Sequence, residues 1–153
     1  MRLTLHTDYA LRLLMLLATE PARRHTVEEV AQRYGISRNH LMKVAQTLVR
    51  SGFIGGTRGR GGGLQLARAS QSINLGAVVR ATEDGFALVE CFDPPGNTCV
   101  IADECALRNP LDRAVRAFLA ELDRYSLADL AKSPGTFRGL HRYPAIHDTE
   151  IRP

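Results

Sequence analysis

A pair of short helices joined by a two-residue turn constrains the fold of this 153-residue chain more than any other feature. The stretch "TVEEVAQRYG" (26–35) begins with Thr26 and Glu29 in the S/T-x-x-E pattern of a capping box and ends on a glycine, so it predicts a helix. The stretch "SRNHLMKVAQTLVRSG" (37–52) predicts a second helix, which Ser37 caps. The apolar residues of its inward face are Leu41, Val44, Ala45 and Leu48. Two helices this close, joined through a glycine-containing turn, are typical of a helix-turn-helix.

The stretch "FIGGTRGRGGGLQLA" (53–67) follows directly and predicts a β-hairpin. Two short apolar segments flank a glycine-rich tip that carries Arg58 and Arg60. A helix-turn-helix followed by such a hairpin is a winged helix. The expected fold class is therefore mainly α with a small β-hairpin.

Further helices flank the winged helix on both sides. Residues 9–19 predict a buried helix with Thr7 or Asp8 as its N-cap. Residues 74–85 predict a helix that begins after an asparagine cap and closes on a glycine, and residues 126–132 predict one short helical turn.

The dipeptide Asn109-Pro110 predicts the start of a long helix, with asparagine as N-cap and proline as the first helical residue. Its apolar residues recur three and four positions apart, at Leu111, Val115, Phe118, Leu122 and Tyr125. Such a narrow seam predicts packing on one partner helix, so we expect a homodimer interface through Leu111, Val115, Phe118 and Leu122. Packing only within its own chain is the alternative.

Charge divides the chain into unequal halves. Residues 1–80 contain 12 basic and 4 acidic side chains, whereas residues 81–153 contain 8 and 12. The basic half predicts an anion-binding module, most simply for nucleic acid. We therefore expect a winged-helix DNA-binding domain at 1–80, a cysteine loop with a dimerisation helix at 81–132, and a poorly ordered tail at 133–153.

Polar residues gather at the start of the second helix of the helix-turn-helix, where a recognition helix meets base edges in the major groove. The candidate DNA-binding residues there are Ser37, Arg38, Asn39, His40 and Lys43, with Arg58 and Arg60 at the wing tip. Asparagine can read adenine, and arginine or lysine can read guanine. We expect a double-stranded, two-fold symmetric operator with half-sites about 34 Å apart.

All three cysteines, Cys91, Cys99 and Cys105, lie in "ECFDPPGNTCVIADEC" (90–105), whose Pro-Pro-Gly run (94–96) predicts a loop without regular structure. Clustered thiols indicate a metal or redox site. Iron–sulfur clusters are usually held by cysteine thiolates. Zinc is the competing metal, although its closely spaced Cys-x₂₋₄-Cys pairs are absent, and a disulfide with a spare thiol is a further alternative.

Several function classes are disfavoured. The apolar run "LRLLMLLA" (11–18) is too short for a membrane span and the N-terminus does not resemble a signal peptide, so we expect a cytoplasmic protein with no membrane partner. The five histidines are dispersed, and no G-x-S-x-G or phosphate-loop motif is present, which argues against an enzyme. A zinc-binding or electron-transfer protein remains the alternative of another class, although an electron carrier would leave the basic winged helix without a purpose.

The stretches "MRLTLHTDYALRLL", "GISRNHLMKVAQTLVRSGFI" and "RGRGGGLQLA", together with the three cysteines, resemble the IscR/NsrR family of bacterial winged-helix regulators. The resemblance covers the chain from Met1 to about Lys132. It implies a homodimer that carries an iron–sulfur cluster in each subunit and regulates genes according to the state of that cluster.

Two positions indicate the branch within this family. Arg108 stands where the IscR-like branch is expected to carry a histidine ligand, and Thr7 to Arg12 match the "TDYxLR" pattern of the nitric-oxide-sensing branch. The resemblance therefore implies a repressor in which nitric oxide attacks the cluster and operator DNA is released. It also implies Asp8, from the partner subunit, as the fourth cluster ligand, and it favours [4Fe–4S] over [2Fe–2S]. From the residues alone Asp8 is instead a helix N-cap, and an IscR-like or general redox or iron-status regulator is the alternative function.

Overall fold

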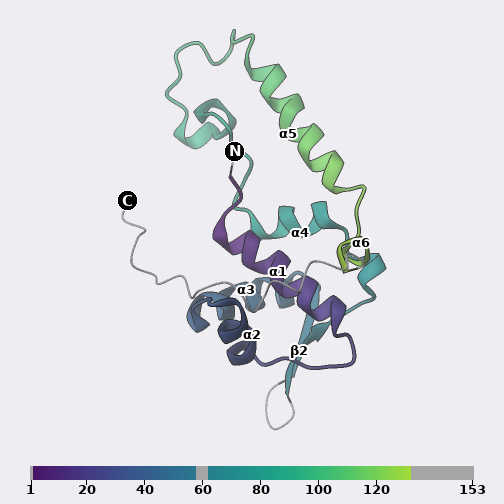
Figure 1. Cartoon of the computed structure of the whole chain (residues 1–153). Coiled ribbons are helices and arrows are strands. Elements are labelled where there is room, and N and C mark those ends of the chain that lie inside the picture. The colour runs from purple at the N-terminus through teal and green to yellow at the C-terminus, as the bar shows by residue number, and fades with distance from the viewer. Residues whose placement is uncertain (1, 58–61, 132–153) are drawn as a thin grey trace.

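The computed structural model describes residues 2–57 and 62–131, and within these it is mainly helical with one antiparallel hairpin (Figure 1). This confirms the predicted fold class. The helices are α1 (Leu5–Thr19), α2 (Val27–Tyr34), α3 (Arg38–Arg50), α4 (Leu75–Thr82), α5 (Arg108–Leu122) and α6 (Leu127–Ala131). The strands are β1 (Ile54–Thr57) and β2 (Gly63–Leu66), and three 3₁₀ turns are η1 (Ser70–Ser72), η2 (Glu90–Phe92) and η3 (Pro94–Gly96).

Helix α1 starts earlier than the sequence predicts. Thr4 is the N-cap, because its hydroxyl accepts a hydrogen bond from the backbone N–H of Thr7. The prediction of Thr7 or Asp8 as the cap is therefore wrong, and both residues lie inside the first turns. The Thr4 backbone N–H donates to Glu83 Oε1 over 2.8 Å, a contact across 79 positions that no local pattern reveals.

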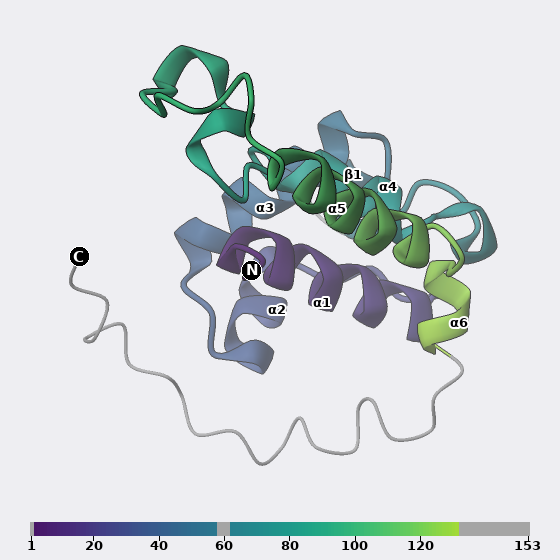
Figure 2. The same ribbon diagram turned by 90° about the horizontal axis from the view of Figure 1, so that it is seen from above.

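The core forms around α1, whose inward residues are almost fully excluded from water. Ala10, Leu13, Leu14 and Leu17 are at most 1% exposed. Helices α3, α4 and α6 all pack against α1 (Figure 2), so this helix is covered on several sides. Burial of each of the three leucines stabilises the fold by roughly 1.5–3 kcal/mol.

The helix-turn-helix forms as predicted. Thr26 and Glu29 make both arms of the capping box, and Ser37 caps α3 by accepting from the N–H of His40. Gly35 has a φ of 64°, a left-handed conformation that favours glycine, and it ends α2. The predicted inward residues of α3, Leu41, Val44, Ala45 and Leu48, are all buried.

The hairpin pairs Ile54 with Leu66 and Thr57 with Gly63. It is anchored to the α1–α2 connection, because the backbones of His25 and Leu64 exchange two hydrogen bonds of 3.2 and 2.8 Å. A side chain at Gly63 would press on the His25 carbonyl, with 3.1 Å between the new carbon and the oxygen. The hairpin base is thus fixed in place, while its predicted tip with Arg58 and Arg60 lies outside the described residues.

The second half differs from the prediction at its helix ends. Helix α4 has the predicted Asn74 cap but ends at Thr82 rather than at the following glycine. Helix α5 begins at Arg108 with Leu107 at the cap position, so the prediction of Asn109 as N-cap is wrong. Proline is tolerated within the first turn because the first N–H groups of a helix have no intrahelical partner.

The C-terminal end of α5 is fixed to α4, whereas its N-terminal end stands away from the body (Figure 1). Arg80 forms a bidentate pair with Asp123, with both N···O distances 2.7 Å, and the Asn74 side chain donates to the Asp123 carbonyl. The short α6 that follows was predicted and packs against α1 (Figure 2). In the described part of the chain, no helix combines the length and the apolar character needed to cross a membrane.

Candidate functional site

The start of α3 presents a polar surface. Ser37, Asn39 and Lys43 are exposed, and the Arg38 side chain is 61% exposed. Arg38 Nε lies 3.3 Å from Glu28 Oε2, so a carboxylate of α2 orients this guanidinium across the turn. A surface salt bridge of this kind contributes little to stability. Its exposed arginine can therefore exchange the carboxylate for a phosphate or a base edge.

His40 differs from its neighbours because it is half-buried. Its ring meets the ring of Tyr9 edge to face, with centroids 4.8 Å apart, and lies 6.1 Å from the ring of His6. His6 Nε2 is 3.2 Å from the hydroxyl of Thr47. The pKa of His6 is lowered below its ordinary value, mainly by burial and to a smaller extent by the neighbouring His40. Sequence reasoning missed this cluster, since its members come from two helices more than thirty residues apart.

A groove of about 660 Å³ separates α3 from the hairpin. The apolar side chains of Met42 and Val49 and the exposed Gln46 and Arg50 line its α3 side, and glycines line its hairpin side. Gln46 and Arg50 continue the polar face of α3 beyond the predicted Lys43. A helical spacing of three to four residues from Lys43 could have identified them.

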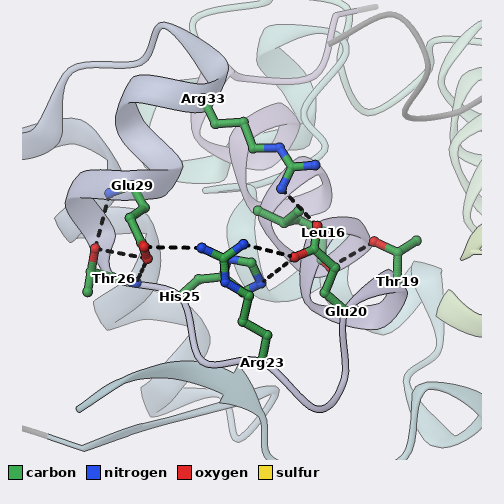
Figure 3. A network of polar contacts seen from close by, with 8 residues as sticks. All are labelled: Leu16, Thr19, Glu20, Arg23, His25, Thr26, Glu29 and Arg33. Atoms are coloured by element: carbon green, nitrogen blue, oxygen red, sulfur yellow. Dashed lines mark hydrogen bonds and ion pairs between the residues drawn. The ribbon is translucent and has the colours of Figure 1, made fainter. Parts of the chain in front are cut away.

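A network of charged side chains joins the end of α1, the α1–α2 connection and α2 (Figure 3). Glu20 directly follows α1 and accepts a 2.8 Å hydrogen bond from Arg33 of α2. This bond is the largest cause that lowers the pKa of Glu20. Arg23 reaches both Glu20 and Glu29, at 3.5 and 3.2 Å. The backbone N–H of Thr26 bonds Glu29 and lowers the pKa of that carboxyl. The network joins the end of α1 to α2.

His25 is the buried member of this region and is only 2% exposed. Its Nε2 has no hydrogen-bond partner and lies 3.4 Å from Glu20 Oε2, a distance suited to an ion pair once the imidazole is protonated (Figure 3). Burial is the main cause that lowers the pKa of His25, so the neutral ring is favoured. Because the same residue holds Leu64 through its backbone, its environment bears on the position of the hairpin.

The three cysteines lie on the loop between α4 and α5, and all are free thiols. Cys91 is buried within η2, whereas Cys99 and Cys105 are half-buried. The Pro-Pro-Gly run adopts a 3₁₀ turn, so the prediction that it excludes regular structure is wrong. Proline fits such a turn because its fixed φ matches that of a 3₁₀ helix. Within residues 2–57 and 62–131, there is no group of three or more His, Cys, Asp or Glu side chains that could hold a metal ion.

This loop lacks the anchoring seen elsewhere. The hydrogen bonds described for residues 86–107 join positions no more than eight apart, as in the contact of Thr98 with Glu90. Val100 is 99% exposed, and the nearby Ile101 and Leu107 are 61% and 58% exposed. Contiguous exposed apolar side chains are typical of surfaces that bind another molecule.

Asp8 lies on the first turns of α1 and is paired within its own chain. Its carboxylate is 2.6 Å from the Arg12 guanidinium, one helical turn away. The Arg12 carbonyl accepts a 3.1 Å bond from the Tyr34 hydroxyl, and burial raises the pKa of Tyr34 to about 12, so this hydroxyl remains a donor. The pair thus lies where α1 contacts α2, and the single chain does not bring Asp8 together with the cysteines into a metal-binding group.

The predicted seam of α5 is only partly covered in the single chain. Val115 is buried and 9% exposed, whereas Leu111, Phe118 and Leu122 are half-buried. Helix α5 packs against α4, and a polar cavity of about 760 Å³ separates its first turns from the start of the cysteine loop. Arg108 lines this cavity together with Asp93 and Asp112.

Comparison with known proteins places this architecture in one family. The Rrf2 family, described as "Iron-dependent Transcriptional regulator", matches residues 3–133. The chain is 48% identical over 134 residues to the HTH-type transcriptional regulator NsrR of Bacillus subtilis, covering 87% of this chain and 92% of that protein. It is 45% identical over 141 residues to NsrR of Halalkalibacterium halodurans, covering 92% and 97%.

Solved structures agree on the fold. CymR, the global cysteine regulator of B. subtilis, superposes with a TM-score of 0.68 at 23% identity, covering 86% of this chain and 96% of that one. The IscR of T. potens superposes with a TM-score of 0.67 at 21% identity, covering 86% and 87%. These relatives are transcription regulators rather than enzymes, as the sequence predicted. The family resemblance is also confirmed: the chain belongs to the Rrf2 family of DNA-binding transcription regulators.

Proposed function

We propose that this protein is a homodimeric repressor that binds a two-fold symmetric operator and releases it when nitric oxide reacts with an iron–sulfur cluster. The observation that carries the proposal is the pairing of a winged helix with a loop of three free thiols in a chain 48% identical to an NsrR regulator. In this proposal the winged helix at 1–80 binds DNA and the segment 81–132 senses and dimerises. The protein acts in the cytoplasm, where DNA and reduced thiols occur together.

The cluster ligands we propose are Cys91, Cys99, Cys105 and Asp8 of the partner subunit. The donor chemistry fits, since three free thiols suit an iron–sulfur cluster and a fourth ligand must come from elsewhere. A loop whose described hydrogen bonds are local can bring its thiols to one centre without breaking long-range hydrogen bonds. We favour [4Fe–4S] over [2Fe–2S]. When bound, the cluster supplies iron with which nitric oxide reacts.

Asp8 is proposed to exchange partners. In the isolated chain its carboxylate pairs with Arg12 at 2.6 Å, and ligation across the dimer would replace that pair. Loss of the iron bond would return Asp8 to Arg12, beside the Tyr34 hydroxyl that joins α1 to α2. The exchange therefore changes the contacts of α1 at its junction with the helix-turn-helix. A switch requires such a local change at an element that has two arrangements.

DNA recognition is proposed for the start of α3 and for the wing. The polar residues of α3 contact base edges and the wing arginines contact phosphates or an adjacent minor groove. This set consists of Ser37, Arg38, Asn39, His40, Lys43, Arg58 and Arg60. Dimerisation through α5 spaces the two reading helices, and the proposed contacts are Leu111, Val115, Phe118 and Leu122.

An iron-status or redox regulator of the same fold is the second candidate, favoured by the family's description as iron-dependent. The two candidate functions differ in the signal that releases DNA. Nitric oxide added anaerobically to the cluster-loaded protein should weaken operator binding at constant total iron. An iron-status sensor would instead lose binding only after a chelator removes iron.

The test combines anaerobic purification, iron and sulfide analysis, Mössbauer spectra and DNA binding before and after nitric oxide. We expect a coloured protein whose operator affinity falls on treatment. Asp8→Asn should lower cluster stability, whereas Asp103→Asn, an exposed carboxylate on the cysteine loop, serves as the matched control. A colourless protein with stoichiometric zinc would contradict the cluster, and unchanged operator affinity would contradict nitric oxide as the signal.

A further inference from the structure

The first turns of α1 contact the recognition helix on both sides of Asp8 in the sequence. Two positions before it, His6 places Nε2 3.2 Å from Thr47 Oγ1 and stacks on His40 with an interplanar angle of 29°. One position after it, Tyr9 meets the His40 ring edge to face at 4.8 Å and 66°. Aromatic pairs in such arrangements contribute about 0.5–1.5 kcal/mol beyond their buried area.

The same turn is attached to the segment that leads into the cysteine loop. Glu83 directly follows α4, and its Oε1 accepts bonds from the Thr4 N–H and hydroxyl over 2.8 and 3.0 Å. The start of α1 therefore makes three kinds of contact. Thr4 bonds Glu83 ahead of the cysteine loop, and Asp8 pairs with Arg12 one turn further along α1. The rings of His6 and Tyr9 contact α3.

Helical geometry places these contacts side by side. His6 and Tyr9 are three positions apart and share one face, and the Arg12 guanidinium lies 5.9 Å from the centre of the Tyr9 ring, so the Asp8–Arg12 pair borders that face. Because a helical turn moves as a unit, a displacement that a new bond imposes on Asp8 must carry both rings with it. Packed side chains respond to such a displacement by changing between discrete arrangements rather than by continuous deformation.

We propose that His6 and Tyr9 are positioning residues that transmit the state of Asp8 to the recognition helix through His40 and Thr47. This inference rests on the proposed function, since it needs two states of Asp8. His40 belongs to the start of α3, for which we propose DNA contacts, and its half-buried ring packs against Tyr9 of α1. A displacement of this ring would therefore also move the neighbouring residues at the start of α3. The cluster state thus reaches DNA through these direct contacts between α1 and α3.

The experiment measures the ratio of DNA affinities in the two states for the full-length protein. The probe is a duplex that the cluster-loaded wild type selects from a random-sequence pool, and affinity is measured by fluorescence anisotropy at fixed salt before and after nitric oxide. The variants are Tyr9→Leu, which removes the ring, Thr47→Val, which removes the hydroxyl with little change of shape, and Tyr9→Phe as the conservative control. Iron content and thermal unfolding are recorded for each.

We expect Tyr9→Leu and Thr47→Val to lower the ratio by about fivefold to tenfold, since site-to-site coupling is typically about 5–150-fold and each variant removes one contact of the connection. Tyr9→Phe should keep the wild-type ratio, because it keeps the ring that contacts His40. All variants should bind the same amount of iron.

Two results would overturn the inference. An unchanged ratio in Thr47→Val and Tyr9→Leu would show that the contacts do not transmit the signal, and an equal loss of affinity in both states would show a merely structural role. If Tyr9→Leu fails to fold, Thr47→Val decides alone. A wild-type ratio of one would instead refute the proposed function itself, and the inference with it.

Discussion

The winged helix and the cysteine loop are held by different kinds of contact. In residues 5–66 each of the three helices has a side-chain cap, and the core residues of α1 are at most 1% exposed. In residues 86–107 the described hydrogen bonds are local, and Val100 is 99% exposed. The first region is stabilised by its own chain. The second is the segment for which we propose a cofactor and contacts with a second subunit.

This difference in contacts agrees with the two roles that we propose for the regions. A DNA-reading helix must be held rigidly, because base contacts depend on side-chain placement within a fraction of an ångström. A sensing loop must respond to its ligand, and responsive elements are drawn from the less stable parts of a structure. Between the two regions, Glu83 ahead of the loop accepts hydrogen bonds from Thr4, the cap of α1.

Hydrogen exchange of the cluster-free protein should show the largest difference between the winged helix and the cysteine loop. Amides of Leu13–Leu17 should exchange through global unfolding and those of 97–103 through local motion, so their protection should differ by at least about a thousandfold. Mass spectrometry of peptides from both regions measures this. Equal protection would contradict the comparison, and loading the cluster should slow exchange only in the loop and the surfaces it contacts.

A pair of apolar substitutions tests the same contrast by stability. Leu14→Ala should lower the free energy of unfolding by about 2–5 kcal/mol, because Leu14 is fully buried. Ile101→Ala should change it by no more than about 0.5 kcal/mol in the cluster-free protein, since its side chain is 61% exposed. Urea denaturation followed by circular dichroism measures both. A large effect of Ile101→Ala would mean that the loop already contributes a core.

Two threonines provide a matched pair of polar substitutions. Thr26→Ala removes one arm of the capping box and should cost about 1 kcal/mol. Thr98→Ala removes the exposed 3.3 Å contact with Glu90 in the loop and should cost almost nothing. The same denaturation experiment compares them, and equal costs would argue against the distinction between the two regions.

The pH dependence of stability between pH 7.5 and pH 5 should give the smallest effect, and the histidines that cause it lie in the winged helix. Burial lowers the pKa of His25 and of His6 in the folded state, whereas residues 84–107 contain no histidine. The unfolded state therefore binds protons more readily. This part of the stability is complete above about pH 6.5 and is lost as the pH falls from there through the folded-state pKa.

His25→Gln isolates one of these contributions. Its free energy of unfolding should fall less than that of the wild type between pH 7.5 and pH 5, while the His6 contribution remains. Parallel slopes for the two proteins would mean that His25 is protonated without cost, through the nearby Glu20.

Local patterns predicted the winged helix well because its elements are specified over short distances. The capping box of Thr26 and Glu29, the Ser37 cap and the glycine at residue 35 each act within a few residues, and the structure confirms them. The cysteine loop and the long helix were also located correctly. The DNA-binding, cluster and dimer residues are proposals, because each of these roles involves a second molecule.

The class of fold, the family and the position of the three thiols on one loop could all be predicted from the order of the amino acids. The start of α1 at Leu5 could not, because its Thr4 cap is held by Glu83 from 79 positions away. Tertiary contacts also show that Asp8 is not an N-cap and that His6 and Tyr9 lie against α3. The physical reason is range: caps and periodicity act between neighbours in the chain, whereas these contacts exist only after distant helices have packed.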